Sequence, residues 1–239
     1  MLQNALIKTI SPQMLLSLNI RNVNELFPGF SIGDFAVVHG SASVSFLTSL
    51  LCVRAQFPPQ VGGLGSSVVF IDGGNTFRLY RVARLAQLHQ LDPQRTLERI
   101  YISRAFTAYQ MTDLITEKLK TIIKKSNAKL VIISDLAGMF LDKNIQDVEA
   151  HSIYRQVTAY LSNFAKENQL VLIATCPPHQ DMPRSDALQA TTCEKANVII
   201  ALRQSKHKRE FILEKHHNLP LGTVEFPSEH LTLEDFTAA

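Results

Sequence analysis

"SVVFIDGGNTFRLYRVARLAQLHQLDPQRTLERIYISRA" (residues 67–105) decides the fold class, because two short apolar runs flank helical sequence. The runs at 67–72 and 100–105 have the length and the valine, isoleucine and aromatic content of strands. Residues 77–91 have a helical pattern, and Asp92-Pro93 starts a second short helix, since proline favours the first helical position. Strand, helix and strand in this order predict a parallel βαβ unit.

The same alternation continues on both sides of this stretch. Further strands are expected at 34–40, 129–135 and 170–176, and helices at 46–57, 108–126 and 147–169. The strand runs are almost continuously apolar, which is typical of strands buried on both faces of a parallel sheet. We therefore predict an α/β protein with a mostly parallel, doubly wound sheet and right-handed crossovers.

The rhythm changes after residue 196, where helices no longer separate the strands. Short strands are expected at 197–204, 209–216 and 222–226, and they predict a C-terminal antiparallel extension at the sheet edge. We predict one domain over residues 1–239, with a lead-in at 1–33, a parallel α/β core at 34–196 and a β extension and tail at 197–239.

The composition of the chain limits which classes of protein it can belong to. The chain has 239 residues, of which 46% are hydrophobic, enough for one sizeable core. No run approaches the roughly 18 apolar residues of a membrane span, and we expect no membrane contact. Cys52, Cys176 and Cys193 have no metal-like spacing, so we expect no metal and a cytoplasmic location. A net charge of +3 is too small to indicate nucleic acid binding.

Residues 40–47, "GSASVSFL", follow the first strand of the core and resemble a phosphate-binding loop without its reactive side chains. The P-loop pattern is G-x-x-x-x-G-K-[ST]. Counting from Gly40, Ser45 replaces the second glycine, Phe46 the lysine and Leu47 the hydroxyl residue. The backbone of Gly40, Ser41, Ser43 and Ser45 can still cradle an anion, whereas Phe46 and Leu47 can bind neither phosphate nor Mg²⁺.

Ligands of open α/β sheets bind at the carboxyl ends of the strands. These ends carry Asp72-Gly73-Gly74, Ser134-Asp135 and Thr175-Cys176-Pro177-Pro178. The segment 77–81, "FRLYR", is interpreted as packing and a helix start rather than as part of the site.

Several stretches resemble the RecA/RadA recombinase family, especially archaeal RadA and short paralogs such as RadB. Residues 68–106 are similar to the family's I-D-T-E-N-T-F-R-P-x-R strand and helix, its G-L-D-P segment and its Y-V-A-R-A-F strand. "LFPGFSIGDFAVVHG" (26–40) resembles the approach to the family's P-loop, and "LEKHHNLPLG" (213–222) a C-terminal H-x-x-L-P-x-G stretch. The resemblance implies a RecA-like P-loop NTPase fold over the whole ATPase core.

The departures from the family pattern fall on the reactive positions. The resemblance places the water-activating glutamate at Gly74 and the metal-side acid at Ser134, with Asp135 one residue later. A slip of one residue turns a strand side chain to the opposite face, although Asp135 can still reach the site from an irregular strand tip. Residues 178–196 replace a long, glycine-bearing DNA loop, and 141–150, in place of the first DNA loop, is acidic on balance.

We interpret the chain as a pseudo-ATPase paralog without catalytic residues or cofactor, acting in DNA recombination or repair through a protein partner. The resemblance implies a RadA-type recombinase or another paralog as that partner, and a dimer or hetero-oligomer is open. The alternative is a divergent DNA-dependent ATPase of the RadA/RadB type with weak ATP/Mg²⁺ binding, and a third option is a signalling partner like the RecA-fold clock proteins. Candidate nucleic-acid contacts are Arg184, Lys206, Lys208 and Arg209, although a solvated turn is the default for the last three.

Overall fold

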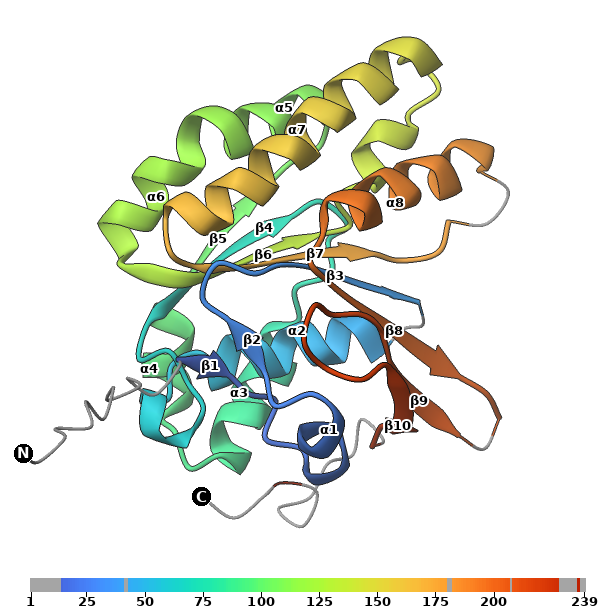
Figure 1. The fold of residues 1–239 in the computed structure, drawn as a ribbon. Helices are drawn as coiled ribbons and strands as arrows, with labels where there is room; N and C mark the ends of the chain where they lie inside the picture. The colour runs from blue at the N-terminus through green and yellow to red at the C-terminus, as the bar shows by residue number, and fades with distance from the viewer. Residues whose placement is uncertain (1–13, 41–42, 180–181, 207, 228–235, 237–239) are drawn as a thin grey trace, which may run out of the picture.

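A computed structural model describes residues 14–40, 43–179, 182–206, 208–227 and 236. Its centre is an eight-stranded sheet with the order β10-β9-β8-β3-β7-β6-β4-β5 (Figure 1). The six strands that pair in parallel are β3 (Phe35–Gly40), β4 (Ser67–Asp72), β5 (Ile100–Arg104), β6 (Ala128–Ser134), β7 (Val171–Cys176) and β8 (Val198–Gln204). β9 (Arg209–Lys215) and β10 (Gly222–Glu225) continue the sheet in antiparallel pairing.

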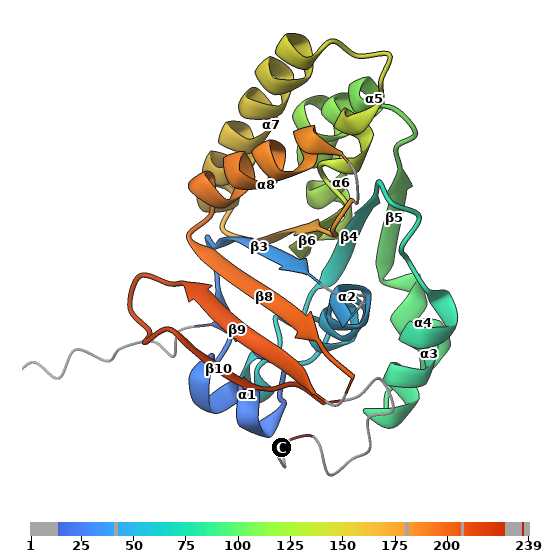
Figure 2. The same cartoon turned by 90° about the vertical axis from the view of Figure 1, so that its right-hand side faces the viewer.

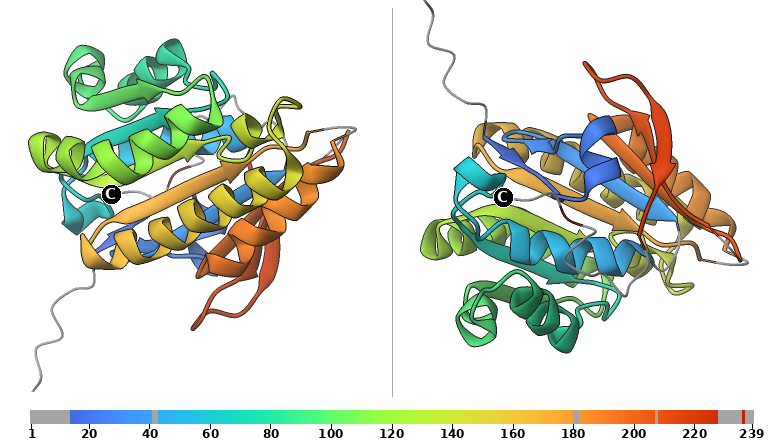
Figure 3. Two further views of the ribbon diagram at one scale, coloured as in Figure 1. Left: turned by 90° about the horizontal axis from the view of Figure 1, so that it is seen from above. Right: turned by 90° about the horizontal axis from the view of Figure 1, so that it is seen from below.

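Helices cover both faces of this sheet (Figure 3). One layer contains α1 (Arg21–Leu26), α2 (Ser43–Arg54), α3 (Leu79–Leu88) and α4 (Pro93–Glu98). The other contains α5 (Ala108–Asp113), the π-helical turn η2 (Leu114–Lys118), α6 (Leu119–Ser126), α7 (Asp147–Glu167) and α8 (Pro183–Lys195). The short 3₁₀ turns η1 (Pro59–Val61) and η3 (Gly138–Leu141) and a two-stranded sheet of β1 (Leu15–Leu16) and β2 (Phe30–Ser31) complete the described elements.

The predicted α/β class and doubly wound sheet are confirmed. The strand at 67–72 has the expected bounds, and the strand bounds on either side differ by about one residue. Asp92 caps α4 as expected, because its carboxylate accepts a hydrogen bond of 2.8 Å from the backbone N–H of Arg95. One detail differs: β8 pairs in parallel with β3, so the antiparallel extension begins with β9 rather than at residue 197.

Residues 178–196, which the resemblance aligns with a DNA-contacting loop, are helical for most of their length, since α8 occupies Pro183–Lys195. The sequence did not indicate this helix, because serine, threonine and aspartate are poor helix formers. In the structure Thr191 and Thr192 donate to the carbonyls of Ala187 (2.9 Å) and Leu188 (3.1 Å) within the helix. Thr192 Oγ1 also lies 2.6 Å from the buried Tyr154 hydroxyl of α7, so packing selects the helix.

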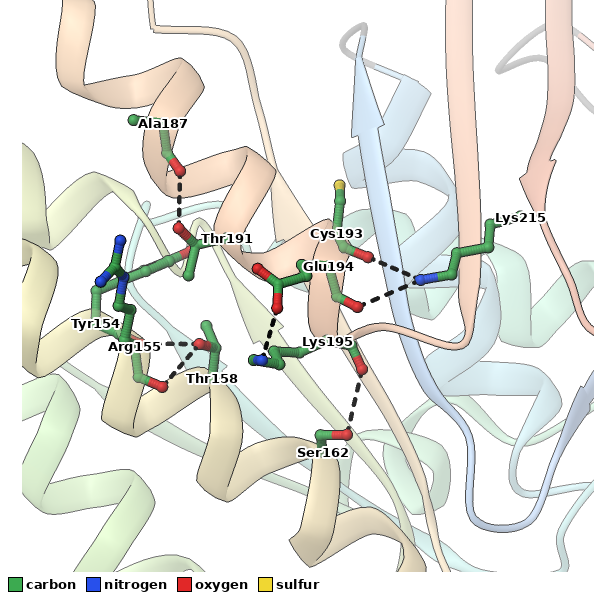
Figure 4. Close-up of polar contacts among 10 residues, drawn as sticks. All are labelled: Tyr154, Arg155, Thr158, Ser162, Ala187, Thr191, Cys193, Glu194, Lys195 and Lys215. Atoms are coloured by element: carbon green, nitrogen blue, oxygen red, sulfur yellow. Dashed lines mark hydrogen bonds and ion pairs between the residues drawn. The ribbon is translucent and has the colours of Figure 1, made fainter.

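The C-terminal end of α8 is fastened to its neighbours (Figure 4). Lys215 of β9 donates to the carbonyls of Cys193 (3.2 Å) and Glu194 (3.3 Å). Ser162 of α7 donates to the carbonyl of Lys195 at 3.2 Å. A cation at the end of a helix is favourable because the exposed carbonyls carry partial negative charge. The segment before β8 is therefore a helix fastened to α7 and β9.

A buried guanidinium joins the lead-in segment to α2. Arg54 Nε donates to the carbonyl of Ser17 at 3.2 Å, and its Nη2 donates to the carbonyl of Val61. The guanidinium also lies 4.8 Å from the centre of the Phe57 ring. Burial lowers the pKa of Arg54 to about 10, which leaves it charged at neutral pH. Its hydrogen bonds to backbone carbonyls compensate the lost hydration.

His89 lies beside this cluster in an aromatic environment. Its ring centre is 5.7 Å from that of Phe57 and 4.4 Å from that of Phe236. Burial, and secondly the charge of Arg54, lower the pKa of His89 from 6.5 to about 4. Between about pH 4 and pH 6.5, the imidazole of His89 is therefore neutral in the folded state, whereas it binds a proton in the unfolded chain.

This difference predicts a loss of stability on acidification. The neutral His89 contributes fully above pH 6.5, and its contribution is lost as the pH falls toward 4. The melting temperature of the natural chain should fall more between about pH 7 and about pH 5 than that of a His89→Leu variant. A Val148→Ala variant changes an exposed, non-titrating side chain of α7 and should keep the natural slope. Equal slopes for the natural chain and His89→Leu would contradict the assignment.

Candidate functional site

The phosphate-loop-like turn joins β3 to α2 at the carboxyl ends of the parallel strands (Figure 2). Gly40 ends β3 with φ +107°, and a Cβ atom there would lie 2.2 Å from the carbonyl oxygen of Leu202. Only glycine fits this position, for both backbone and space reasons. Ser41 lies outside the described residues, and α2 begins at Ser43.

Phe46 and Leu47 belong to the core rather than to the turn. Phe46 is 1% exposed and its ring centre lies 6.0 Å from that of Phe226. Leu47 is fully buried in the same cluster. The two residues predicted to replace the P-loop lysine and the metal-binding hydroxyl thus pack in the core.

Ser45, in the place of the second glycine, connects the turn to the segment after β4. Its hydroxyl donates to the carbonyl of Thr76 at 3.3 Å and accepts from Arg81 Nη1 at 3.0 Å. Serine therefore holds α2 and α3 together at this end of the sheet.

A pocket of about 400 Å³ lies beside the turn. It is lined by Gly40, Val44, Ser45, Thr48, Thr76, Arg78, Arg81, Thr175, Pro177 and Pro178. Sequence reasoning placed Gly40 and Ser45 here but assigned Arg78 and Arg81 to packing. Their position at the start of a helix that follows a strand end was the available signal, since such starts face the carboxyl edge of the sheet.

Asp72 organises the strand tips through hydrogen bonds within the chain. Its Oδ1 accepts from the backbone N–H of Thr76 (2.8 Å) and from the hydroxyl of Ser134 (2.8 Å). Its Oδ2 accepts from the N–H of Phe77 at 3.3 Å, and Arg104 Nε is 3.8 Å away. Ser134, which the resemblance places at the position of the metal-side acid, therefore serves as a hydrogen-bond partner for Asp72.

Asp135 turns back toward the site because its backbone has φ +50°. Its backbone N–H donates to Thr175 Oγ1 at 2.9 Å, and its Oδ1 accepts from the N–H of Gly138 at 3.1 Å. A Cβ atom at Gly74 would lie 2.8 Å from Asp135 Cβ and 3.1 Å from Asp135 Oδ2. The side chain of Asp135 thus lies where a residue at 74 would extend.

His179 was missed by sequence reasoning and pairs with Asp135. Its Nε2 lies 2.8 Å from Asp135 Oδ1. The preceding Pro177 and Pro178 fix φ at the exit of β7 and so limit the directions in which His179 can lie. The pair forms a carboxylate–imidazole contact 44 residues apart in the sequence, which no local pattern reveals.

The candidate nucleic-acid residues lie in two different settings. Arg184 of α8 donates to the carbonyls of Phe140 (2.8 Å) and Ile145 (3.0 Å) and to the carboxylate of Asp147. Its guanidinium is therefore used to hold α8 against the segment before α7, and a nucleic-acid contact there stays a prediction.

The other three line a second pocket of about 250 Å³ at the turn between β8 and β9. It contains Lys206, Lys208 and Arg209 together with Glu225. Lys208 also pairs with Glu210 at 2.8 Å, so part of the positive charge is neutralised.

Among the described residues, no three histidine, cysteine, aspartate or glutamate side chains are arranged to hold a metal ion. None of the described helices is long and apolar enough to cross a membrane.

The mostly parallel sheet, the glycine-ended turn into α2 and the site at the strand ends define an α/β protein of the RecA-like P-loop class. Residues 17–193 match the Rad51 family, and the chain belongs to it. It is similar to the DNA repair and recombination protein RadA of Cenarchaeum symbiosum (strain A), with 36% identity over 101 residues. That match covers 42% of this chain and 25% of the relative, so the chain spans about a quarter of that relative's length.

Restoring the P-loop letters should damage the core instead of restoring an ATP site. Phe46→Lys/Leu47→Thr places a charge and a hydroxyl among apolar side chains and should lower the free energy of unfolding by about 3–5 kcal/mol. Denaturant titration measures this loss. The control, Phe46→Leu/Leu47→Met, should cost about 1.5 kcal/mol or less per site. A double lysine–threonine variant of natural stability would show that these side chains do not pack in the core.

Gly74 and Asp135 should be energetically coupled, because they compete for one space. Gly74→Ala should be destabilising in the natural chain and cost less when Asp135→Gly is also present, with a coupling of about 0.5–3 kcal/mol. A double-mutant cycle by denaturant titration measures this value. Asp135→Asn keeps the Cβ atom and should leave the cost of Gly74→Ala unchanged. Additive costs with Asp135→Gly would rule out the competition.

Proposed function

We propose that this Rad51-family protein is non-catalytic and acts in DNA recombination or repair by binding a protein partner, such as a RadA-type recombinase or another paralog. The replaced residues support the absence of hydrolysis. Phosphoryl transfer needs a cation at the β- and γ-phosphates, a metal-binding hydroxyl and a residue that orients water. Phe46, Leu47 and Gly74 stand at these positions, and the first two are buried.

The observation that carries the partner role is the open edge of the sheet at β5. β5 is the terminal strand in the sheet order, and no described strand pairs with its other edge. Tyr101 and Ile102 are each 44% exposed there, and Phe106, just beyond the strand, is 75% exposed. The opposite terminal strand, β10, is instead packed against α1. An exposed edge strand with apolar side chains favours pairing with an extended segment of another chain.

A further exposed aromatic side chain lies close in sequence to this edge. Tyr109, 54% exposed, lies in the first turn of α5, and its hydroxyl donates to the carboxylate of Glu149 at 2.7 Å. Apolar groups of this size contribute to the centre of protein interfaces once water is excluded. The same edge could accept a second copy of the chain, which accommodates a dimer or a hetero-oligomer.

A divergent DNA-dependent ATPase is the second candidate. Arg78 and Arg81 beside the turn, and the Asp135–His179 pair near Gly74, are the observations in its favour. Such an enzyme would take its cation from α3 and its base from the β7 exit. The basic turn of Lys206, Lys208 and Arg209 is its candidate DNA contact, offset by Glu210 and Glu225.

Charge on the β5 edge should disrupt partner binding. Ile102→Lys should weaken binding to the RadA of Cenarchaeum symbiosum, used as the probe, by about 10-fold or more, because a charge would be buried at the interface. Calorimetry of the two purified proteins measures this affinity. Leu221→Lys, at the other edge of the sheet, is the matched control and should bind like the natural chain.

Two results would contradict the proposal. Equal binding by the natural chain and both variants would remove β5 from the interface. ATP hydrolysis by the chain alone, or by its complex with a RadA variant that lacks the P-loop lysine, would favour the ATPase instead.

A further inference from the structure

The second pocket, at the turn between β8 and β9, is separate from the pocket beside the loop after β3 and has a polar lining. We propose that this pocket, the β8–β9 pocket, binds a carboxylate group and that Arg209 is the residue that recognises it. The carboxylate belongs to a small organic acid or to an acidic side chain of a protein segment. This inference is independent of the proposed partner at β5 and of whether the protein hydrolyses ATP.

Arg209 has an unused hydrogen-bond donor at this pocket. Its Nη1 atom is buried and has no hydrogen-bond partner among the described residues. A donor of a charged group that is buried without an acceptor costs free energy. Because the side chain of Arg209 lines the pocket, a small rotation brings this nitrogen to an acceptor on a bound ligand. Binding of an acceptor would therefore remove an existing cost as well as add a contact.

Backbone hydrogen bonds fix the walls of the β8–β9 pocket. Arg209 is the register partner of Gln204 on β8, and its carbonyl accepts from the backbone N–H of Phe226 at 2.9 Å. The turn is closed by Ser205, whose backbone N–H donates to the carbonyl of Lys208 at 2.8 Å. The N–H of Lys208 donates to Ser205 Oγ at 3.2 Å. The residues that line the pocket are thus held by paired strands and a closed turn before any ligand binds.

The charges around the pocket favour a ligand group with one negative charge. Lys208 Nζ pairs with Glu210 at 2.8 Å, and the carboxylate of Glu225 lines the pocket beside Lys206 and Arg209. Since like charges repel, Glu225 opposes a doubly charged phosphate group more strongly than a carboxylate. A guanidinium presents planar paired donors that match the two oxygens of a carboxylate. Arg209 therefore fits a carboxylate better than a phosphate.

The size of the pocket limits the ligand to a small group. Its volume is about 250 Å³, below the range of roughly 300–1,000 Å³ of pockets for drug-sized ligands. Gln204 and Ser205 add neutral polar groups to the lining, and Phe226 adds an apolar wall. A carboxyl group on a short carbon chain matches this combination.

The position of Arg209 separates this site from an exposed nucleic-acid contact. A nucleic-acid backbone binds the lysine and arginine side chains that face solvent. The side chain of Arg203, on β8, is 69% exposed and does not line the pocket, whereas Arg209 is half-buried. Nucleic acid should therefore depend on Arg203 at least as much as on Arg209, and a carboxylate in the pocket should depend on Arg209 alone.

The test is calorimetric titration of the full chain with succinate and with the end-blocked tripeptide Gly-Glu-Gly, at constant ionic strength. The neutral matched ligands are succinamide and end-blocked Gly-Gln-Gly. We expect saturable binding of at least one acid and of neither amide. Tighter binding of succinate assigns the pocket to a small organic acid, and tighter binding of the tripeptide assigns it to an acidic protein segment.

Two variants locate the binding site. Arg209→Gln should weaken binding of the acid by about 10-fold or more, as the loss of a charged hydrogen bond implies. Arg203→Gln is the matched control, because it removes the same charge from the neighbouring strand outside the pocket. Arg203→Gln should bind the acid like the natural chain.

Three results would overturn the inference: no saturable binding of either acid at millimolar concentration, equal binding of acids and amides, or equal weakening by Arg209→Gln and Arg203→Gln. The comparison of acids with amides uses the natural chain and needs no variant to fold. Binding of single-stranded DNA without binding of either acid would assign the turn to nucleic acid and would also overturn the inference.

Discussion

The buried carboxylate of Asp72 is the interaction on which the arrangement of the site depends. It joins the tip of β4 to Ser134 at the tip of β6 and to the backbone N–H groups of Thr76 and Phe77. A buried carboxylate is costly unless its oxygens are satisfied, and these donors satisfy them. Because the turn after β4 is held in this way, α3 starts at a defined place and brings Arg78 and Arg81 to the pocket.

The changes from the family pattern form a connected set in the structure. Gly74 leaves the space into which Asp135 turns, and Asp135 in turn holds His179 and the start of η3. Phe46 and Leu47 pack inward, while Ser45, in the first turn of α2, is half-buried and accepts from Arg81. Each of these residues is packed against its neighbours. Changing only one of them to the residue of the family pattern would therefore place it among side chains that already fill the space.

The site and the open sheet edge lie on two neighbouring strands of the sheet. β4 carries Asp72, and its neighbour β5 carries the exposed Tyr101 and Ile102. Arg104 at the end of β5 approaches Asp72 with its Nε at 3.8 Å. The strand tip that carries Asp72 and the strand with the open edge are therefore direct hydrogen-bonding neighbours.

Much of the fold was predictable because its signals are local. A strand buried on both faces must be apolar along its whole length, so β3, β4, β6 and β7 are visible as short runs of sequence. Asp92 as a cap and Gly40 as the end of β3 follow from backbone requirements of single residues. The α8 helix was not predictable in this way, because its stability depends on Tyr154, Ser162 and Lys215 from other elements.

The sequence by itself determined the α/β class and the resemblance carried by residues 68–106, and it predicted that Phe46, Leu47 and Gly74 replace the P-loop lysine, its hydroxyl partner and the catalytic glutamate. They follow from which residues are present and from their order along the chain. The tertiary structure alone decided what replaced them: the inward packing of Phe46, the Asp135–His179 pair and the two arginines at the pocket. The physical reason is that each of these depends on contacts between segments at least 31 residues apart in the sequence. Only the folded sheet brings such segments together.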